Sequence, residues 1–352
     1  MLTSERRLAL FVIVNAHDIV TQRLSAQSFN SKATAMLTRE DWNYLRKRHL
    51  YGLARLGLQM PHDTMSRIYE VVWSTQRGAL QQAIDALQRE SVEPLVYKGA
   101  EIAERYGAST AFALRGDCDI MIRKEDVAKA KAVLAELGYI QGNFNTVDRT
   151  MSPLDASRLA GLEEGRYVLP SFGRVQRISR NPFKLEASVS EHPFYGGDGQ
   201  DLVVVALDLS IGLDREIDAD RFLSSSVPSA FPGARAMRPD DHLWYLCSLF
   251  YIQVQQHRQN CSLSKLADIV LLLSGERALD WAYIIDTAQR LAILPSMYYT
   301  LAFLNAASPS VNIPDWVLEE LNPLNGPRAR DFGWQLHKLF GMVEPIPTEF
   351  LV

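Results

Sequence analysis

The sequence lacks the features that would assign it to a disulfide-rich, zinc-binding or membrane-spanning class. It has three cysteines in 352 residues, Cys118, Cys247 and Cys261, and no CxxC spacing occurs among them. An odd number without that spacing is typical of reduced thiols, not of a disulfide framework or a zinc site. The longest apolar runs, at residues 8–14 and 243–252, are shorter than the roughly 18 residues that span a bilayer. We therefore expect a cytoplasmic protein without a transmembrane helix.

A large excess of charge of one sign is also missing. The chain has 37 Lys and Arg against 41 Asp and Glu, a formal net charge of −4. Bulk charge therefore gives no general attraction to DNA or RNA, although a local basic patch stays possible. With 47% apolar and 22% charged residues, the composition is that of a globular protein with one large or two ordinary domains. Disordered and collagen-like chains are excluded.

Three common catalytic patterns do not occur. The seven histidines show no HxH or HExxH spacing, so a histidine metal site is not indicated. No Gly-x-Ser-x-Gly elbow is present to anchor a serine hydrolase. The glycine-rich residues 196–199 lack the Lys-Ser or Lys-Thr that would follow in a P-loop, and a turn is the simpler interpretation.

The beginning and the end of the chain show the spacing of helices. Apolar side chains recur on one face across residues 42–58 and 64–89, with Asp63 or Thr64 as the expected N-cap of the second helix. Two arginines before residues 8–14 imitate a short signal peptide, but seven apolar residues are the bare minimum, so we expect an ordinary first helix. Further helices are predicted from Pro239 onward, at residues 263–273, 280–291 and 315–321.

Residues 92–140 alternate short strands with helices. The β-prone run at residues 93–97 is followed directly by Lys98-Gly99 and a short helix. A second β-prone run at residues 119–122 precedes a helix that stops at Gly138. The pattern predicts a compact α/β core.

Residues 141–200 show little periodicity and are predicted to be rich in loops. One helix is expected to open at Ser152-Pro153 and to end at Gly165. A meander of strands is then added to the sheet. Its expected strands are residues 174–178, 183–189 and 202–211, with turns at Asn181-Pro182 and at residues 196–199.

The predicted fold class is therefore α+β, with a small mixed β-sheet core flanked by N-terminal and C-terminal helical regions. Three regions follow from the pattern: an N-terminal helical region at residues 1–91, an α/β core with an added β meander at 92–215, and a C-terminal helical region at 238–352.

Asp117 and Asp119 are the most informative residues of the core. In a strand they point to the same side about 7 Å apart, while Cys118 turns toward the core. Two carboxylates on one face repel each other unless a divalent cation lies between them. Ligation by oxygen alone favours Mg²⁺ or Mn²⁺ over zinc.

The spacing alone is weak, because 41 acidic residues in this chain give about five acid-x-acid triplets by chance. Asp218-Ala219-Asp220 is such a bystander. What distinguishes Asp117 and Asp119 is a third acid, Asp208, at the end of a later apolar β run, where an adjacent strand brings it alongside. Three acids at one sheet edge would make a two-metal site that neutralises a triphosphate. The alternatives for the third acid are Asp201, Asp214 and Glu186.

Residues 92–140 resemble the uncharacterised nucleotidyltransferase family of the polymerase-β-like superfamily. The resemblance lies in the strand ending in Lys98-Gly99, the segment Arg115-Gly-Asp117-Cys-Asp119, and the helix ending in Gly138-Tyr139. It extends more weakly over most of the chain, including Asp208 and the Leu-Ala-Asp-Ile motif at residues 266–269.

The resemblance implies Mg²⁺-dependent transfer of a nucleoside monophosphate from an NTP such as ATP, with Mn²⁺ as the alternative ion. It implies that Asp117, Asp119 and Asp208 are the catalytic metal ligands. Lys98, Gly99 and Arg115 would bind the nucleotide. Arg115 is open to two interpretations, a phosphate contact or a partner of the aspartates.

Two positions depart from the family pattern. After Asp208 the chain continues with Leu209-Ser210, where the family often has Leu-His. Lys98-Gly99 replaces the usual Gly-Ser turn, so Lys98 and backbone N–H groups would have to hold the phosphates.

The acceptor and the alternatives stay open at this stage. A small molecule or a peptide fits the net charge, whereas an RNA acceptor would bind the segment from Arg166 to Lys184, which has five basic and no acidic residues. A segment of this kind is more often a solvated face that offsets nearby acids. Lys265 and Asp268 are either a lid over the site or a helix-face ion pair. A non-catalytic nucleotide- or partner-binding protein on the same fold is the alternative from another class.

Overall fold

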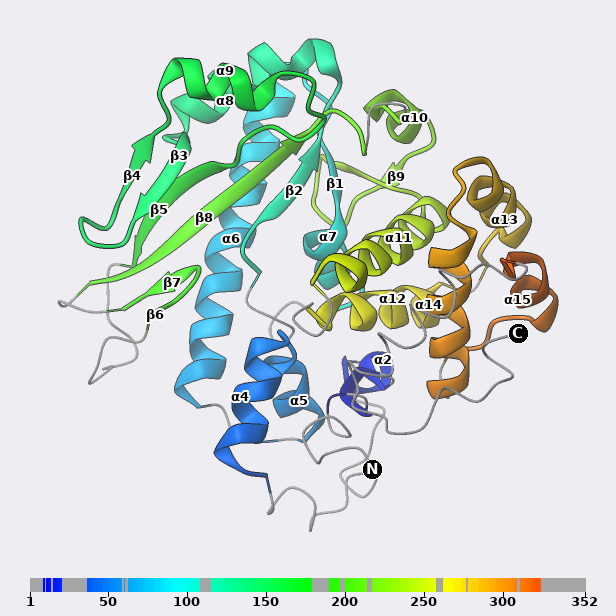
Figure 1. Ribbon diagram of the computed structural model, residues 1–352. Coiled ribbons are helices and arrows are strands. Elements are labelled where there is room, and N and C mark those ends of the chain that lie inside the picture. Colours follow the sequence, from blue (N-terminus) through cyan, green and yellow to red (C-terminus); the bar gives the residue numbers. More distant parts are fainter. Residues whose placement is uncertain are drawn as a thin grey trace. The chain divides into compact units, whose positions relative to one another are not determined.

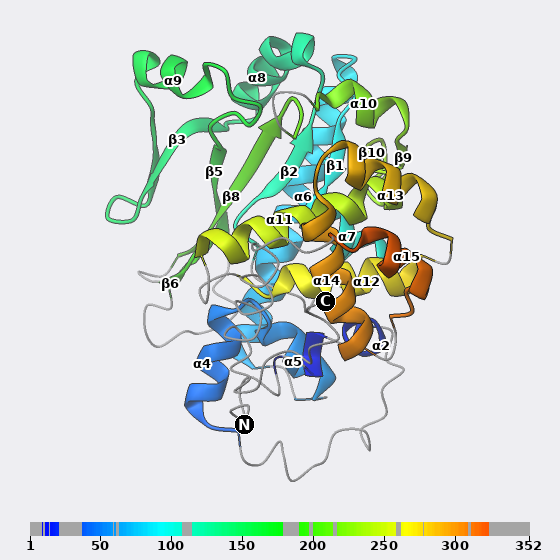
Figure 2. The same cartoon turned by 45° about the vertical axis from the view of Figure 1, so that its right-hand side comes forward.

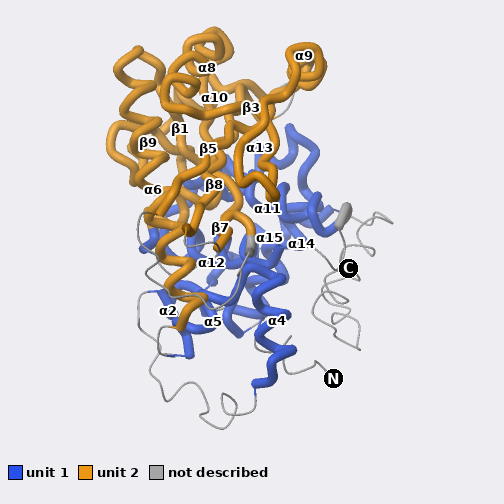
Figure 3. The backbone as a smooth tube through the Cα atoms, turned by 90° about the vertical axis from the view of Figure 1, so that its left-hand side faces the viewer, with its two compact units in different colours: residues 1–61, 106–113, 239–352 blue, residues 62–105, 114–238 orange. Residues whose placement is uncertain are grey.

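The computed structural model describes residues 9, 11–13, 15–20, 37–58, 60, 63–107, 115–178, 190–196, 200–213, 217–257, 262–276, 278–308 and 311–323. Its contacts divide the chain into two compact units, coloured separately in Figure 3. The sheet unit comprises residues 62–105 and 114–238, and the helical unit comprises 1–61, 106–113 and 239–352. A mixed sheet with helices at both ends of the chain confirms the α+β class. The three regions predicted from the sequence, at residues 1–91, 92–215 and 238–352, stay a prediction. Each compact unit is made of several separate segments of the chain, so the two units do not test those boundaries.

The sheet unit is built on one mixed sheet. Eight of its described strands follow the order β4-β3-β5-β8-β2-β1-β10-β9, and the β6–β7 hairpin is attached to β8. Figure 2 shows β3, β5, β8, β2 and β1 side by side. The strands are β1 (Leu95–Tyr97), β2 (Cys118–Met121), β3 (Ile140–Asn145), β4 (Thr150–Pro153), β5 (Phe172–Ile178), β6 (Ser190–Glu191), β7 (Phe194–Tyr195), β8 (Asp201–Ser210), β9 (Val227–Pro228) and β10 (Arg235–Ala236).

Strand β8 is the centre of this sheet. It pairs in parallel with β2 and antiparallel with β5 and β7. Residues 202–205 are all buried, as expected for a strand covered on both faces. Farther along, Leu207 and Leu209 are fully buried whereas Ala206 and Asp208 are only half-buried. Because side chains alternate along a strand, the face that carries Asp208 is the more open one.

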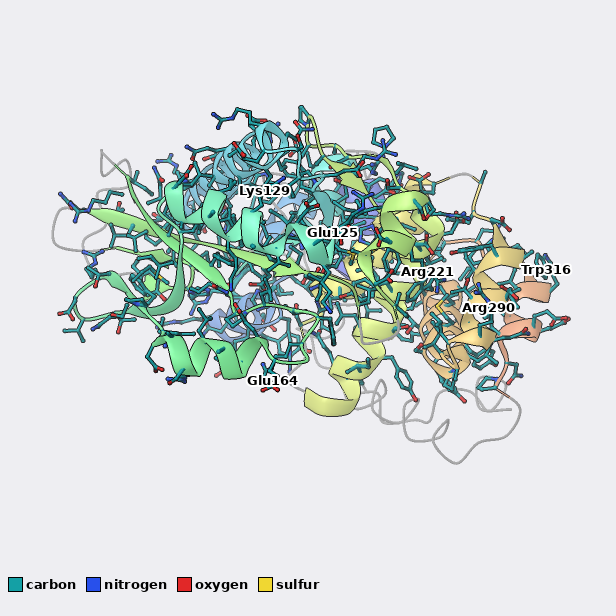
Figure 4. The ribbon with its side chains drawn as sticks, turned by 90° about the horizontal axis from the view of Figure 1, so that it is seen from above. Glu125, Lys129, Glu164, Arg221, Arg290 and Trp316 are labelled. Carbon is teal, nitrogen blue, oxygen red and sulfur yellow. The ribbon has the colours of Figure 1, made fainter. Side chains whose placement is uncertain are left out.

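The long helix α6 (Thr64–Arg89) lies along one face of the sheet (Figures 1 and 2). Its bounds match the predicted helix, and Asp63 is its N-cap, accepting a hydrogen bond from the Ser66 N–H at 2.8 Å. The other helices of the unit are α7 (Lys98–Arg105), η2 (Lys124–Asp126), α8 (Val127–Glu136), α9 (Ala156–Glu163) and α10 (Ala219–Ser224). Glu125 and Lys129, labelled in Figure 4, have exposed side chains on η2 and α8.

The prediction that residues 141–153 are loop followed by a helix start at Ser152-Pro153 is wrong. These two residues belong to β4, which pairs with β3 in a hairpin. The N-cap of α9 is instead Asp155, which accepts a hydrogen bond from the Arg158 N–H at 2.8 Å. A Ser-Pro pair fits a helix start locally, but the cross-strand pairing and the Asp155 cap outweigh that preference.

Strands β9 and β10 were not anticipated from the sequence. β10 pairs in parallel with β1, so that Leu95 faces Arg235. Several expectations fall outside the described residues: the strand at 183–189, the turns at 181–182 and 197–199, and Cys261, Asp214, Glu186, Arg180 and Lys184.

The helical unit contains α2 (Ala16–Val20), α4 (Arg39–Lys47), α5 (Tyr51–Gly57), α11 (Pro239–His257), α12 (Ser264–Gly275), α13 (Trp281–Arg290), α14 (Leu294–Ala307) and α15 (Asp315–Leu321). The helix expected at residues 42–58 is two helices, because His49 takes a left-handed conformation with φ 57° between them. Helix α14 was not anticipated, since it is apolar on most sides and shows no single buried stripe. Among the described helices, none is long and apolar enough to cross a membrane.

Candidate active site

Two strands bring two of the three predicted acids together. Asp119 on β2 and Asp208 on β8 are register partners on adjacent parallel strands. Neighbouring strands lie about 4.8 Å apart, and partners in register point to the same face. The structure therefore places both carboxylates side by side on the more open face of the sheet, and Asp119 is buried there.

The third acid, Asp117, lies immediately before β2. Cys118, between the two aspartates, is fully buried, and Asp117 is exposed. The charge of Asp117 raises the pKa of both Asp119 and Asp208. The charge of Asp117 therefore acts on both other carboxylates, and Asp208 comes from a separate stretch of chain.

The electrostatics of this cluster are unfavourable without a cation. Burial, with the charges of Asp117 and Asp208, raises the pKa of Asp119 to about 7, and Lys98 opposes the shift. Burial and the charge of Asp117 likewise raise the pKa of Asp208, against a hydrogen bond from Ser171 that lowers it. Oδ1 of Asp208 is buried and accepts no hydrogen bond from the described residues. Buried like charges with an unsatisfied oxygen are the environment that a bound cation relieves.

Lys98 supplies positive charge to this face. It stands at the junction of β1 and α7 with φ 58°, a left-handed conformation that is strained for a lysine. Its Nζ lies 2.5 Å from Oδ1 of Asp119 and 5.0 Å from the centre of the Tyr97 ring. The side chains of Lys98 and Asp119 are 22% and 8% exposed. Lys98 is therefore part of the carboxylate cluster and not an ordinary surface lysine.

Gly99 and Arg115 are in contact across the start of α7. A Cβ built on Gly99 would overlap the guanidinium of Arg115, so glycine is what allows this close approach. The backbone of Arg115 is held by Gln76 on α6, whose Nε2 donates to the Arg115 carbonyl at 2.7 Å. Two cationic side chains and a helix start thus lie on the β1 side of Asp119.

The donor set suits a hard divalent cation, because oxygen atoms of carboxylates are the ligands that Mg²⁺ and Mn²⁺ prefer. Within the described ranges, however, no three His, Cys, Asp or Glu side chains form a ready-made metal cluster. The position nearest to Asp119 is taken by the Lys98 ammonium. The acids fit the ion chemically, and Lys98 competes with it.

Two further expectations concern Ser210 and the basic segment. Ser210 lies two residues after Asp208 on the same face of β8, where it is fully buried and its Oγ lies 2.9 Å from the hydroxyl of Tyr97. Arg174 lies over the Tyr139 ring at 4.6 Å and donates to the Leu137 carbonyl at 2.9 Å. Arg174 thus has a packing role. Lys265 and Asp268 lie on α12 in the helical unit.

A cavity of about 440 Å³ is lined by residues 165–170. This segment continues the line of β5 along the end of β8, where the Leu169 N–H donates to the Leu209 carbonyl at 2.9 Å. The next residue, Ser171, hydrogen-bonds Asp208. The segment that lines the cavity therefore runs along the edge of β8 opposite to β2.

His192 is a residue of this region that the sequence gave no reason to select. It lies just before β7, and its Nε2 is 3.4 Å from the Cβ position that a side chain at Gly116 would have. Burial lowers the pKa of His192, and the charge of Asp117 opposes this shift without reversing it. The β6–β7 hairpin brings His192 there through pairing with β8. No spacing pattern among the seven histidines could have shown this.

The family comparison decides the class of the protein. A family model described as uncharacterised nucleotidyltransferase matches residues 64–307, more than half of the chain. The chain belongs to this family. The matched residues run from the start of α6 to the end of α14 in this nucleotidyltransferase.

Other comparisons add little. No curated protein matches the nucleotidyltransferase. One solved structure, the antibiotic-resistance factor ANT(2'')-Ia, is similar with 14% sequence identity and a TM-score of 0.35 over 63% of this chain and 95% of that one.

Proposed function

We propose that this nucleotidyltransferase transfers a nucleoside monophosphate from an NTP such as ATP to a hydroxyl group of a small molecule or a peptide. The reaction depends on Mg²⁺ or Mn²⁺. The observation that carries the proposal is the register of Asp119 and Asp208 on adjacent strands, with Asp117 close enough to raise the pKa of both. Sheet strands hold this constellation, which favours precise positioning of a substrate.

Lys98, Gly99 and Arg115 bind the phosphates in this proposal. Two cations at the start of α7 provide positive potential, and the helix start adds backbone N–H groups that face an anion. Gly99 supports the role because it lets the Arg115 guanidinium lie against the backbone. When phosphate arrives, the Lys98 ammonium gains an anionic partner other than Asp119.

Asp117, Asp119 and Asp208 hold the divalent cations. Such cations would supply positive charge that offsets the negative charge developing on the phosphates. Asp208 also accepts the proton of the acceptor hydroxyl, which suits a carboxyl whose pKa is raised by burial. A bond forms between the acceptor oxygen and the α-phosphorus. The bond from that phosphorus to the bridging oxygen breaks, and pyrophosphate leaves with the electron pair.

The experiment that tests this function uses the full-length protein, MgCl₂ and each of the four α-labelled NTPs with an extract of the host cell. We expect label from at least one NTP to appear on a compound or macromolecule of the extract. Asp117→Asn should reduce transfer by at least ~100-fold, because it removes a ligand for the ions. Asp220→Asn is the matched control, since Asp220 ends a second Asp-x-Asp triplet outside the site.

The outcomes separate the acceptor classes as well. Label on RNA with transfer that falls steeply between low and moderate salt would replace the small-molecule or peptide acceptor, because phosphate contacts release counterions. Transfer that Asp117→Asn leaves intact would contradict the proposed metal site. Absence of label from all four NTPs would contradict the proposed reaction.

A further inference from the structure

The site extends to both sides of strand β2, and we call the side toward β1 the β1 flank. The sheet order puts β1 on one side of β2 and β8 on the other. Lys98, Gly99 and Arg115 belong to the β1 flank, since Tyr97, which precedes Lys98, pairs with Asp119. The β6–β7 hairpin pairs with the same edge of β8 as β2 does, at earlier residues of β8, and so lies at the N-terminal end of β2. The residues that we assign to the phosphates therefore all lie on the β1 flank.

His192 approaches the acids from the N-terminal end of β2, where Gly116 precedes Asp117. Its Nδ1 lies 3.2 Å from the hydroxyl of Tyr195, so a hydrogen bond between them fixes the orientation of the ring. The opposite nitrogen, Nε2, faces the backbone of Gly116, one residue before Asp117. Gly116 leaves the space in front of Nε2 without a side chain.

The hairpin that carries His192 is well anchored to the sheet. The Val204 N–H donates to the Pro193 carbonyl at 2.9 Å, and Phe194 is fully buried opposite Val203. Arg149 also holds the segment, since its guanidinium donates to the Tyr195 carbonyl at 2.7 Å. The imidazole is thus presented by a supported turn.

Tyr195 itself is packed from the other side. Its ring lies 4.6 Å, centre to centre, from the ring of Phe144 on β3. It meets the imidazole edge to face at 6.3 Å. Nδ1 of His192 is therefore committed to a fixed partner. Nε2 has no hydrogen-bond partner among the described residues, and the His192 side chain is open to solvent.

We propose that His192 is an acceptor-binding residue, whose Nε2 hydrogen-bonds the attacking hydroxyl or a polar group beside it, and that Tyr195 is the positioning residue that holds its ring. The inference rests on the proposed function. In a nucleotidyl transfer the attacking and leaving oxygens lie roughly in line. With pyrophosphate on the β1 side of β2, the acceptor binds beside Gly116 and Asp117, where His192 lies.

The test compares full-length wild type with His192→Ala, His192→Gln and Tyr195→Phe. Transfer from the α-labelled NTP is measured against increasing concentration of the host-cell extract, which gives an apparent KM for the acceptor. Binding of the α,β-methylene analogue of the same NTP, with MgCl₂, is measured by calorimetry. His17→Ala, in the helical unit, is the matched control for loss of a histidine.

We expect His192→Ala to raise the apparent KM for the acceptor at least tenfold while the Kd of the analogue changes less than twofold. His192→Gln restores part of the affinity, because its side-chain amide can still hydrogen-bond at a similar reach. Tyr195→Phe raises KM about threefold, since it frees the ring without removing Nε2. A purely structural role of His192 would not produce this split between KM and analogue binding.

The contrary outcomes are distinct. An unchanged KM in His192→Ala, or a weakened analogue Kd with normal KM, overturns the role of His192 and leaves the proposed reaction standing. If His192→Ala does not fold, the same criteria apply to His192→Gln and Tyr195→Phe, which should then raise KM alone. No transfer by wild type contradicts the proposed function, and the role of His192 is rejected with it.

Discussion

The sheet unit contains two Asp-x-Asp triplets, at residues 117–119 and 218–220. In the first, the central cysteine is buried and Asp119 lies between two neighbouring strands with Asp208 beside it. In the second, both aspartates are exposed at the start of a helix. Asp218 caps α10 by accepting from the Arg221 N–H, and Asp220 pairs with Arg123 at 2.9 Å.

The difference lies in the partners and not in the spacing. The acids of the second triplet meet hydrogen-bond donors and a cation, whereas Asp119 meets two like charges as well as Lys98. Ordinary structural acids are satisfied by the protein itself. An acid cluster that the fold leaves unfavourable marks a place where a ligand contributes the missing charge.

The largest effect that would test this comparison is on the pH dependence of stability. The pKa of Asp119 is raised from 3.8 to about 7, so the folded protein retains a proton that the unfolded chain loses. The stabilisation that this retained proton gives the folded protein is complete below about pH 4. It is lost as the pH rises to about 7. The loss is at most about 4 kcal/mol, at 1.36 kcal/mol per unit. We therefore expect Asp119→Asn to gain stability relative to wild type as the pH rises from about 4 to about 7, measured by urea unfolding in EDTA.

Asp220→Asn is the control for this measurement. Asp220 is 64% exposed, and surface ion pairs contribute roughly 0–1 kcal/mol. The free energy of unfolding of the Asp220→Asn variant should therefore follow that of wild type at every pH. Parallel curves for Asp119→Asn and wild type would contradict the account of an unfavourable acid cluster.

A smaller effect is expected on metal binding without nucleotide. Lys98→Met removes the ammonium that lies 2.5 Å from Asp119. A hydrogen bond between charged groups contributes roughly 1.5–3 kcal/mol, so its loss from the metal-free protein should strengthen Mn²⁺ binding by about tenfold or more. Titration of Mn²⁺ followed by electron paramagnetic resonance measures this directly.

The second triplet again supplies the control. Arg123→Met removes the cation that pairs with Asp220 and should leave Mn²⁺ binding as in wild type. Weaker Mn²⁺ binding in Lys98→Met would mean that Lys98 organises the carboxylates and does not compete with the ion.

The smallest effect concerns the cap at Asp218. Asp218→Ala removes the side chain that accepts from the Arg221 N–H, and loss of an N-cap costs ~1 kcal/mol. We expect this decrease in the free energy of unfolding, with nucleotidyl transfer within twofold of wild type. A large loss of transfer would give the second triplet a functional role and remove the contrast between the two.

The sequence predicts features that depend on local pattern. Helix α6 was predicted with its bounds because its apolar stripe and its cap, Asp63, are both local. The side-by-side arrangement of Asp119 and Asp208 was expected because each is associated with an apolar β run. Their register, however, is a property of the β2–β8 pairing and appears only in the structure.

What the sequence could not show depends on contacts between distant segments. Strands β9 and β10 have two residues each, too few for any periodicity, and β10 is a strand because β1 lies beside it. His192 reaches Gly116 only through the pairing of its hairpin with β8. The turn of Lys98 onto Asp119 follows from a left-handed backbone that its residue type does not favour.

The two outermost strands in the described order, β4 and β9, each contain a proline, Pro153 and Pro228. Proline offers no N–H to a neighbouring strand, and proteins use it at edges to prevent sheets from joining. These edges are therefore poor templates for β-augmentation by a bound chain. If the acceptor is a peptide, we expect the enzyme to recognise it as a flexible segment that presents one side-chain hydroxyl, without recruiting it as an additional strand.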